Sequence, residues 1–255
     1  MLSKRYLTVL FALLFAAIAT MGAACTASAA AASAAPADVW QKADALYAKR
    51  YDLKNVQEAL ELVSPFLEAG NYEALWRAAR CTYWLGHKAK GKDNRLPLFD
   101  KGKALAERAT KANSNKPEGF YWIAANIGKA GLDRGILNSL MNVKPMKAAL
   151  DRVLAIDPSY SDAHRVLADL YAKVPGWPLS IGDSKKAVAH AEAALKAKPL
   201  DIRYNRSGAE AYLDAKNPKA AKGCLQTIVE APLSVEEPDD DKLDKEWAAD
   251  ELKKL

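Results

Sequence analysis

Residues 157–199 read DPSYSDAHRVLADLYAKVPGWPLSIGDSKKAVAHAEAALKAKP, and this segment decides the fold that the sequence predicts. It holds two runs of helical periodicity, separated by residues 174–183 and closed by Pro199. Residues three and four apart lie side by side on a helix, so each run has one face of small or apolar side chains. That face carries Leu167, Ala168 and Tyr171 beside His164 in the first run, and Ala187, Ala191 and Ala194 in the second. The segment therefore predicts two helices that pack against each other.

Prolines recur along the chain at a regular spacing. Pro117, Pro158, Pro199 and Pro232 each close an alanine-containing helical segment, and they lie 41, 41 and 33 residues apart. A period of about 34 residues is that of the tetratricopeptide repeat (TPR), a unit of two helices joined by a turn. No run alternates apolar and polar residues long enough for a strand. We therefore predict an all-α, TPR-like right-handed solenoid of about five helix pairs, capped by a charged helix at residues 239–255.

Two of the repeats are longer than the standard unit by about seven residues each. We place the extra residues between the first and second helix, at Gly128–Pro145 and at residues 174–183, so that both insertions leave the solenoid on the same edge. In the second insertion Pro175 and Pro178 restrict the backbone around Trp177. Two interpretations stay open: Trp177 packs back onto its own repeat, or it lines a binding surface.

The N-terminus has the layout of a secretory signal peptide. Lys4 and Arg5 precede an apolar run, and small residues follow it. The stretch Met21–Cys25 resembles a lipobox, which makes Cys25 the predicted lipid anchor, whereas cleavage at an Ala-x-Ala site is the alternative. The predicted division is a signal peptide at residues 1–24, an alanine-rich tether at 25–37 and a helical-repeat domain at 38–255.

Charge and cysteine content exclude several classes of function. The net charge of +6 falls to +4 when Lys4 and Arg5 leave with the signal, and the remaining charges are scattered, so we expect no nucleic-acid partner. Cys81 and Cys224 fall in apolar helical patterns far apart in the chain, which favours two buried free thiols over a disulfide.

The sequence offers little support for catalysis or for a cofactor. The stretch Gly86–Lys92 matches a phosphate-binding loop only in part, because Asp93 follows where Ser or Thr is needed and no strand precedes it. The three histidines are dispersed, and there is no zinc-binding spacing. We expect neither an enzyme nor a bound cofactor or metal. An enzyme stays open only if His164, Arg165 and Asp183 converge around a small molecule.

Residues 120–199 resemble a known family. They match a Trp-x-Ala-x-Asn-x-Gly helix, an Asp-Pro-x-Tyr turn, a His-Arg-x-Leu helix and a Pro-Gly-Trp-Pro loop that ends in Gly-Asp. This pattern is similar to that of TatT, the T component associated with tripartite ATP-independent periplasmic (TRAP) transporters. The chain has Ser161-Asp162-Ala163 where the family often has Gly-Gly-Pro. The matching positions include Trp122, Asn126, Asp157, Tyr160, His164, Arg165, Pro175, Trp177, Pro178 and Asp183.

The resemblance implies a periplasmic lipoprotein, more readily of the outer than of the inner membrane. Such a protein docks a TRAP-type solute-binding protein, assists the uptake of an organic or hydrophobic acid, and forms a homotrimer in some cases. The alternative is a general TPR lipoprotein scaffold for envelope assembly, which gives Trp177 no specific role. The residues expected to bind the partner or ligand are Trp122, Asn126, His164, Arg165, Pro175, Trp177, Pro178 and Asp183.

Overall fold

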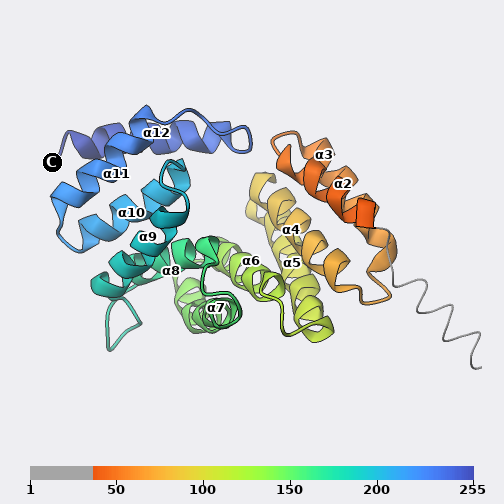
Figure 1. Cartoon of the computed structure of the whole chain (residues 1–255). Helices are drawn as coiled ribbons and strands as arrows, with labels where there is room; N and C mark the ends of the chain where they lie inside the picture. Colours follow the sequence, from red (N-terminus) through yellow and green to blue (C-terminus); the bar gives the residue numbers. More distant parts are fainter. Residues whose placement is uncertain (1–36) are drawn as a thin grey trace, which may run out of the picture.

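The computed structural model describes residues 37–255, which form an all-α solenoid (Figure 1). The predicted signal peptide, nearly all of the tether and the predicted anchor Cys25 lie outside the described residues. The helices are α2 (Ala37–Ala48), α3 (Leu53–Val63), the short 3-10 helix η1 (Ser64–Phe66), α4 (Tyr72–Lys88), α5 (Lys92–Ala112), α6 (Glu118–Arg134), α7 (Ile136–Ile156), α8 (Ser161–Lys173), α9 (Ser184–Ala197), α10 (Ile202–Asp214), α11 (Pro218–Glu230) and α12 (Pro238–Leu252).

Consecutive helices pair in sequence, from α2 with α3 to α10 with α11, and α12 packs on the last pair. The pairs follow a curved path, so that the start of α12 comes close to α2 and α3 (Figure 1). The predicted TPR-like architecture of five helix pairs and a capping helix is thus confirmed. Among the described residues, no helix is both long enough and apolar enough to cross a membrane.

Short polar side chains begin several of the helices. Asp52, Asn71, Asp183, Asp201 and Asn217 each accept a hydrogen bond from a backbone N–H in the first turn of the helix that follows. Each such cap satisfies a donor that lacks a partner within the helix and stabilises the helix by about 1 kcal/mol.

Small residues fill the contacts between paired helices. Ala187, Ala191 and Ala194 of α9 are fully buried, and so is Ala168 of α8, as their spacing predicts. Alanine allows close approach of two helix backbones, so the alanine-rich faces determine which side of each helix turns inward. Cys81 and Cys224 are buried free thiols, which confirms that prediction.

The interpretation of Gly128–Pro145 as a loop insertion is wrong. The extra residues lengthen the helices instead, because α6 continues to Arg134 and α7, of 21 residues, begins at Ile136. Only Gly135 separates them, with a φ of 98° that favours glycine. Gly128 and Gly131 lie inside α6, and α7 accommodates Pro145 in its interior. Residues 174–183 do form the predicted loop between α8 and α9.

Candidate functional site

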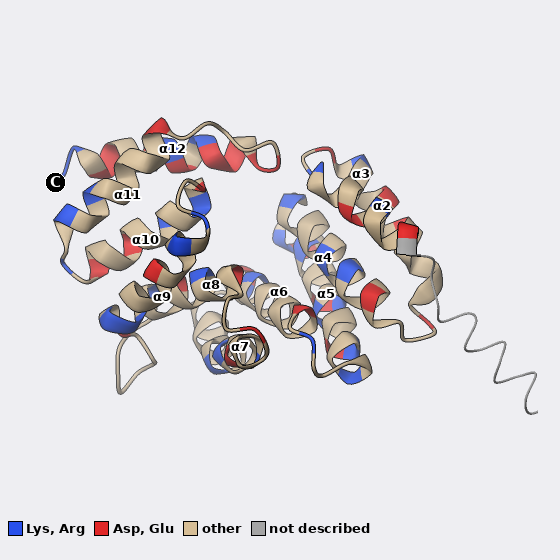
Figure 2. Cartoon of the chain, viewed as in Figure 1, with Lys and Arg blue, Asp and Glu red and all other residues tan. Residues whose placement is uncertain are grey.

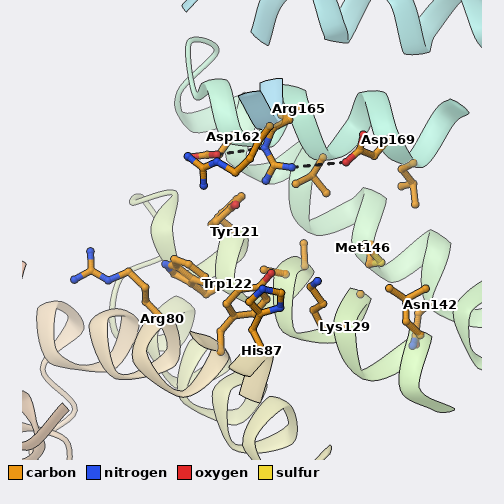
Figure 3. A pocket seen from close by; sticks show the side chains of 18 of the residues that line it. Arg80, His87, Tyr121, Trp122, Lys129, Asn142, Met146, Asp162, Arg165 and Asp169 are labelled. Atoms are coloured by element: carbon orange, nitrogen blue, oxygen red, sulfur yellow. Dashed lines mark ion pairs between the residues drawn. The ribbon is translucent and has the colours of Figure 1, made fainter. Parts of the chain in front are cut away.

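The concave side of the solenoid holds a cavity of about 1000 Å³. Its walls come mainly from α4, α6 and α8, the first helices of three successive repeats, and from the start of α7 (Figure 3). The rest of the lining comes from α2 and the turn after it, from the start of the 174–183 loop, from Lys198 and α10, and from the segment between α11 and α12. The cavity therefore combines residues from helices far apart in the sequence.

Each of the three first helices contributes a stripe of side chains to this cavity. The stripes follow the helical spacing of three or four residues. The stripe of α4 is Arg80, Tyr83, Trp84 and His87; that of α6 is Tyr121, Trp122, Ala125 and Lys129; and that of α8 is Asp162, Arg165, Val166, Asp169 and Lys173.

Arg80 presents a positively charged group that aromatic rings hold in place. Its guanidinium lies over the rings of Tyr47 and Trp76, 4.0 and 4.9 Å from their centroids. Its Nη2 donates to Asp44 over 2.6 Å, whereas its buried Nε has no hydrogen-bond partner among the described residues. An unpaired buried N–H is costly, so Arg80 retains the capacity to bind an acceptor.

Arg165 lies across the cavity from Arg80 and is paired only loosely (Figure 3). Its Nε lies 3.6 Å from Oδ1 of Asp162, and its Nη1 lies 3.7 Å from Oδ2 of Asp169, so both pairs are beyond hydrogen-bond range. Its Nε is buried and also lacks a partner among the described residues. Burial alone lowers the pKa of Arg165, but the neighbouring groups, including the two carboxylates, outweigh burial and raise its pKa. Arg165 is therefore a charged donor without a good acceptor.

The side of the cavity formed by α6 and α7 is apolar. Leu132 and Ile136 lie at the corner where the two helices meet, and Ile136 is largely exposed. Together with the arginines, this wall gives the cavity one charged and aromatic region and one aliphatic region. The apolar side chains of this wall are Leu132, Ile136, Leu140, Val143 and Met146. Leu170 of α8 and Val174, which follows α8, extend the apolar region.

Three of the predicted binding residues come together in this cavity. Trp122, Arg165 and Pro175 all line it. Trp177 and Pro178 lie instead at the tip of the 174–183 loop, outside the cavity lining. The side chain of Trp177 is 90% exposed, so it does not pack back onto its own repeat.

The base of this loop is tied to the repeat. Gly182 N–H donates to the carbonyl of Pro175 over 2.9 Å, and Asp183 N–H donates to the carbonyl of Tyr171 over 3.1 Å. A side chain at position 182 would collide with the backbone of Val174. The loop therefore presents Trp177 on a fixed base.

The other predicted binding residues have structural partners. Asn126 is fully buried where α6 meets α5, and its amide donates to the carbonyl of Trp122 over 2.8 Å. His164 hydrogen-bonds His190 and the carbonyl of Pro158, at 2.9 and 3.0 Å. Asp183 is the N-cap of α9. His164 and Asp183 therefore do not converge with Arg165 in the cavity lining, as the enzyme alternative requires.

Sequence reasoning missed most of the charged and aromatic lining. The helical spacing of Arg80, Tyr83, Trp84 and His87 on α4 was a signal, because polar and aromatic side chains share the face opposite the small residues. The contributions of Arg50 and Arg203 had no such signal, since they belong to repeats far apart in the sequence. Within the described residues, no group of three or more His, Cys, Asp and Glu side chains could hold a metal ion.

Comparison with solved structures supports the fold. TTC0263, a thermophilic TPR protein of Thermus thermophilus, is similar over 82% of this chain and 98% of its own, at 17% identity and a TM-score of 0.60. The MamA protein matches over 75% and 93% of the two chains, at 17% identity and a TM-score of 0.49. YrrB, described as a TPR protein with an unusual peptide-binding site, matches over 81% and 87%, at 16% identity and a TM-score of 0.48. The match to TTC0263, at this identity, shows the fold alone.

Comparison of the sequence with protein families is more specific. A search of curated proteins finds no match. The family model of regulator of microtubule dynamics protein 1-3 matches residues 39–176, from the first described helix to the loop after α8. This match covers more than half of the 255 residues. The chain belongs to the family of regulator of microtubule dynamics protein 1-3.

Proposed function

We propose that this protein is a non-enzymatic binding protein whose cavity holds an organic acid with an apolar body. The observation that carries this proposal is the pair of arginines, Arg80 and Arg165, each with a buried Nε that lacks an acceptor among the described residues. A carboxylate is the acceptor that suits a guanidinium best. The aliphatic wall around Ile136 and Met146 suits the apolar part of such a ligand.

The proposal includes a protein partner that docks beside the cavity. Trp177 and Leu179 are 90% and 82% exposed at the tip of a loop whose base, at Pro175, lines the cavity. Large exposed apolar side chains on a fixed loop are suited to a protein contact, because little ordering is needed when they are covered. The resemblance of residues 120–199 to TatT supports a TRAP-type solute-binding protein as this partner.

The location proposed for the protein rests on its sequence. The signal-like N-terminus and the lipobox resemblance support export to the periplasm and anchoring through Cys25, at the outer membrane in preference to the inner. A lipid anchor would hold the cavity near a membrane face, where a solute-binding protein can reach it.

Binding of a simple acid tests the cavity. Sodium decanoate has a carboxylate and an apolar chain, and Trp84 and Trp122 in the lining report its arrival by fluorescence. We expect Arg165→Gln to weaken decanoate binding by about tenfold or more, because a charge-assisted hydrogen bond is lost. Arg152→Gln is the matched control, since Arg152 is exposed and does not line the cavity. Equal binding by both variants, or equal binding of uncharged decanol and decanoate, contradicts the proposal.

Replacement of Trp177 by Ala tests the docking partner. The side chain is so exposed that the free energy of unfolding of the variant should lie within about 0.5 kcal/mol of that of the wild type. A pull-down from an envelope extract should recover a periplasmic solute-binding protein with the wild type and lose it with Trp177→Ala. If both the wild type and Trp177→Ala recover only outer-membrane assembly proteins, the result supports the general scaffold for envelope assembly instead.

The family match favours a second candidate function. The matched family is described as regulators of microtubule dynamics, and its model covers the repeats that carry Arg80, Trp122 and Arg165. A role at microtubules predicts that residues 37–255 sediment with polymerised tubulin and change its growth rate. Absence of both effects, combined with decanoate binding, leaves the first proposal in place.

A further inference from the structure

The two ends of the solenoid meet through polar contacts. Glu237, just before α12, accepts hydrogen bonds from Arg50 after α2 and from Arg203 of α10, each over 2.9 Å. Asp240 in the first turn of α12 accepts a hydrogen bond from Lys88 at the end of α4 over 2.6 Å. The contacts of Glu237 with Arg50 and of Asp240 with Lys88 join residues more than 150 positions apart. We call this set of contacts the seam.

The seam lacks the apolar packing that holds the repeats together. The larger hydrophobic cluster runs from α2 to α9 and also includes Ala211, and the smaller one joins α10, α11 and α12. In the described chain, neither cluster contains apolar side chains of both α12 and the first two repeats. Closure therefore depends on charge, because the acidic start of α12 lies where the last helix of the solenoid comes close to α2 and α3 (Figure 2). Salt screens the more exposed pair of Asp240 and Lys88 more strongly than the largely buried pair of Glu237 and Arg50, whereas it does not weaken apolar packing.

The basic side of the seam is ordered without help from α12. The guanidinium of Arg50 lies over the rings of Tyr47 and Trp84, at 5.2 and 5.0 Å from their centroids. The indole of Trp84 in turn donates to the carbonyl of Arg50 over 2.7 Å. Lys88 also lies over Trp84. Arg50 and Lys88 thus stay in position when the segment that carries Glu237 and Asp240 moves away, so that its release is reversible.

The seam is also part of the cavity wall. Arg50, Arg203 and Glu237 all line the cavity, and the side chain of Glu237 is only 12% exposed. A solenoid repeat contacts mainly its neighbours, so a small change of curvature in each repeat can separate the two ends. Separation would remove one wall of the cavity while leaving every helix pair intact.

We propose that the seam is a releasable electrostatic latch. When the latch is closed, Glu237 forms part of the cavity wall. When the latch is open, the ligand can enter the cavity. The role in admission rests on the proposed function of the cavity, whereas the opening itself does not.

Distances across the seam test the opening. Nitroxide labels at Lys54→Cys on α3 and Leu243→Cys on α12 lie at exposed positions on its two sides, and Cys25→Ser keeps labelling to these two thiols. We expect a single short distance between the two nitroxides at about 50 mM salt. At about 1 M salt, a third or more of the molecules should show a second, longer distance. A single separation at both salt concentrations overturns the latch.

Charge reversal gives a second and independent measurement. Asp240→Lys places like charges opposite Lys88 and should produce the longer separation even at low salt. The swapped pair Lys88→Asp with Asp240→Lys should restore the short one at pH 8. Asp250→Lys is the matched control, because Asp250 lies on the same helix but pairs only with Lys253 within the described chain. Helical circular dichroism shows whether each variant is folded; should Asp240→Lys unfold, the salt series of the wild type still decides the outcome.

Ligand entry separates the latch from the proposed function. Mixing with sodium decanoate, followed by tryptophan fluorescence, gives the association rate constant. We expect the association rate constant to rise about fivefold or more in Asp240→Lys and to return to the wild-type value in the swapped pair. The reason is that the rate of binding to a gated site is proportional to the fraction of molecules that are open. A rate that stays constant while the separations change overturns the role in admission. Loss of binding in every variant, with the separations changing as expected, refutes the proposed ligand and leaves the latch standing.

Discussion

At the scale of single residues, Gly182 illustrates how a loop can require one residue type. A Cβ at this position would lie 2.1 Å from the carbonyl oxygen of Val174 and 2.8 Å from the carbonyl carbon of Pro175. Both atoms belong to the backbone, which cannot move aside as the end of a flexible side chain can. The close approach of residues 176 and 182 at the base of the loop therefore depends on glycine.

We predict that Gly182→Ala lowers the free energy of unfolding by about 2 kcal/mol through this overlap. Urea denaturation measures the change. Gly176→Ala provides the control, because a Cβ there would meet the carbonyl oxygen of Gly182 at an ordinary 3.5 Å. Equal stability of the two variants would show that the loop base relaxes freely.

Residue roles were predictable from the sequence where they follow from periodicity. The buried faces of α8 and α9 around Leu167 and Ala191 follow from spacing alone, because only one side of a helix can turn toward its partner. The position of Trp177 did not follow, since loop residues have no such period. The contact of His164 with His190 was equally hidden, because His190 belongs to a neighbouring helix.

At the scale of helices, the contact between α8 and α9 contains a pair of histidines. The carbonyl of Pro158 can only accept, so Nε2 of His164 donates to it, and Nδ1 of a neutral His164 then accepts from Nδ1 of His190. The ring of His190 also stacks on Tyr171. Burial, followed by the charge of His164, lowers the pKa of His190 below its usual value of 6.5, while Asp151 and Lys147 of α7 act in opposite directions.

We predict that this pair makes stability depend on pH. The unfolded chain binds a proton on His190 more readily than the folded chain does. The contribution of neutral His190 to the free energy of unfolding is therefore complete above about pH 6.5. It falls as the pH drops toward the lowered pKa of His190 in the folded state. The urea midpoint should therefore decrease between pH 7.5 and pH 5.5. His190→Gln should reduce this decrease, and an equal pH dependence in that variant would contradict the assignment.

Helix boundaries show where sequence patterns lose information. The 174–183 loop was predictable because prolines and a glycine interrupt the helical pattern at Pro175, Gly176 and Pro178. The corner between α6 and α7 was not, since Gly128, Gly131 and Gly135 lie close together there and only Gly135 has the positive φ of a turn. A single glycine is compatible with a helix interior, so only the packing of α7 against α6 decides that the chain turns at this point.

At the scale of the whole molecule, the core is divided unevenly. The larger cluster extends from α2 to α9, whereas the smaller cluster holds α10, α11 and α12 together around Leu225 and Ile228. Repeat proteins can lose terminal units before the rest because each unit depends mainly on its neighbours. The C-terminal helices should therefore open first.

We predict that Cys224 becomes reactive at a lower urea concentration than Cys81. Both thiols are buried, and burial raises the pKa of each to about 11, so their intrinsic reactivities are comparable. Alkylation with iodoacetamide at increasing urea, read by mass spectrometry, measures the order, and Cys25→Ser removes the third thiol. Simultaneous labelling would indicate that the solenoid unfolds in one step.

The overall architecture was predictable because proline spacing reports the repeat directly. The cavity was predictable only as a concave face, since its charged lining combines helices whose sequences carry no common motif. Arg50 and Glu237 are separated by 187 positions, and nothing in either local sequence indicates the other.

The contact between the first repeats and the start of α12 also restricts how this protein can evolve. An open array tolerates gain or loss of a unit, because its last unit contacts nothing beyond its neighbour. Here an added or deleted pair of helices would shift Glu237 away from Arg50 by the width of a whole unit. Duplication, the usual source of variety in such proteins, is therefore penalised, and relatives that keep both side chains should have kept the same number of units between them.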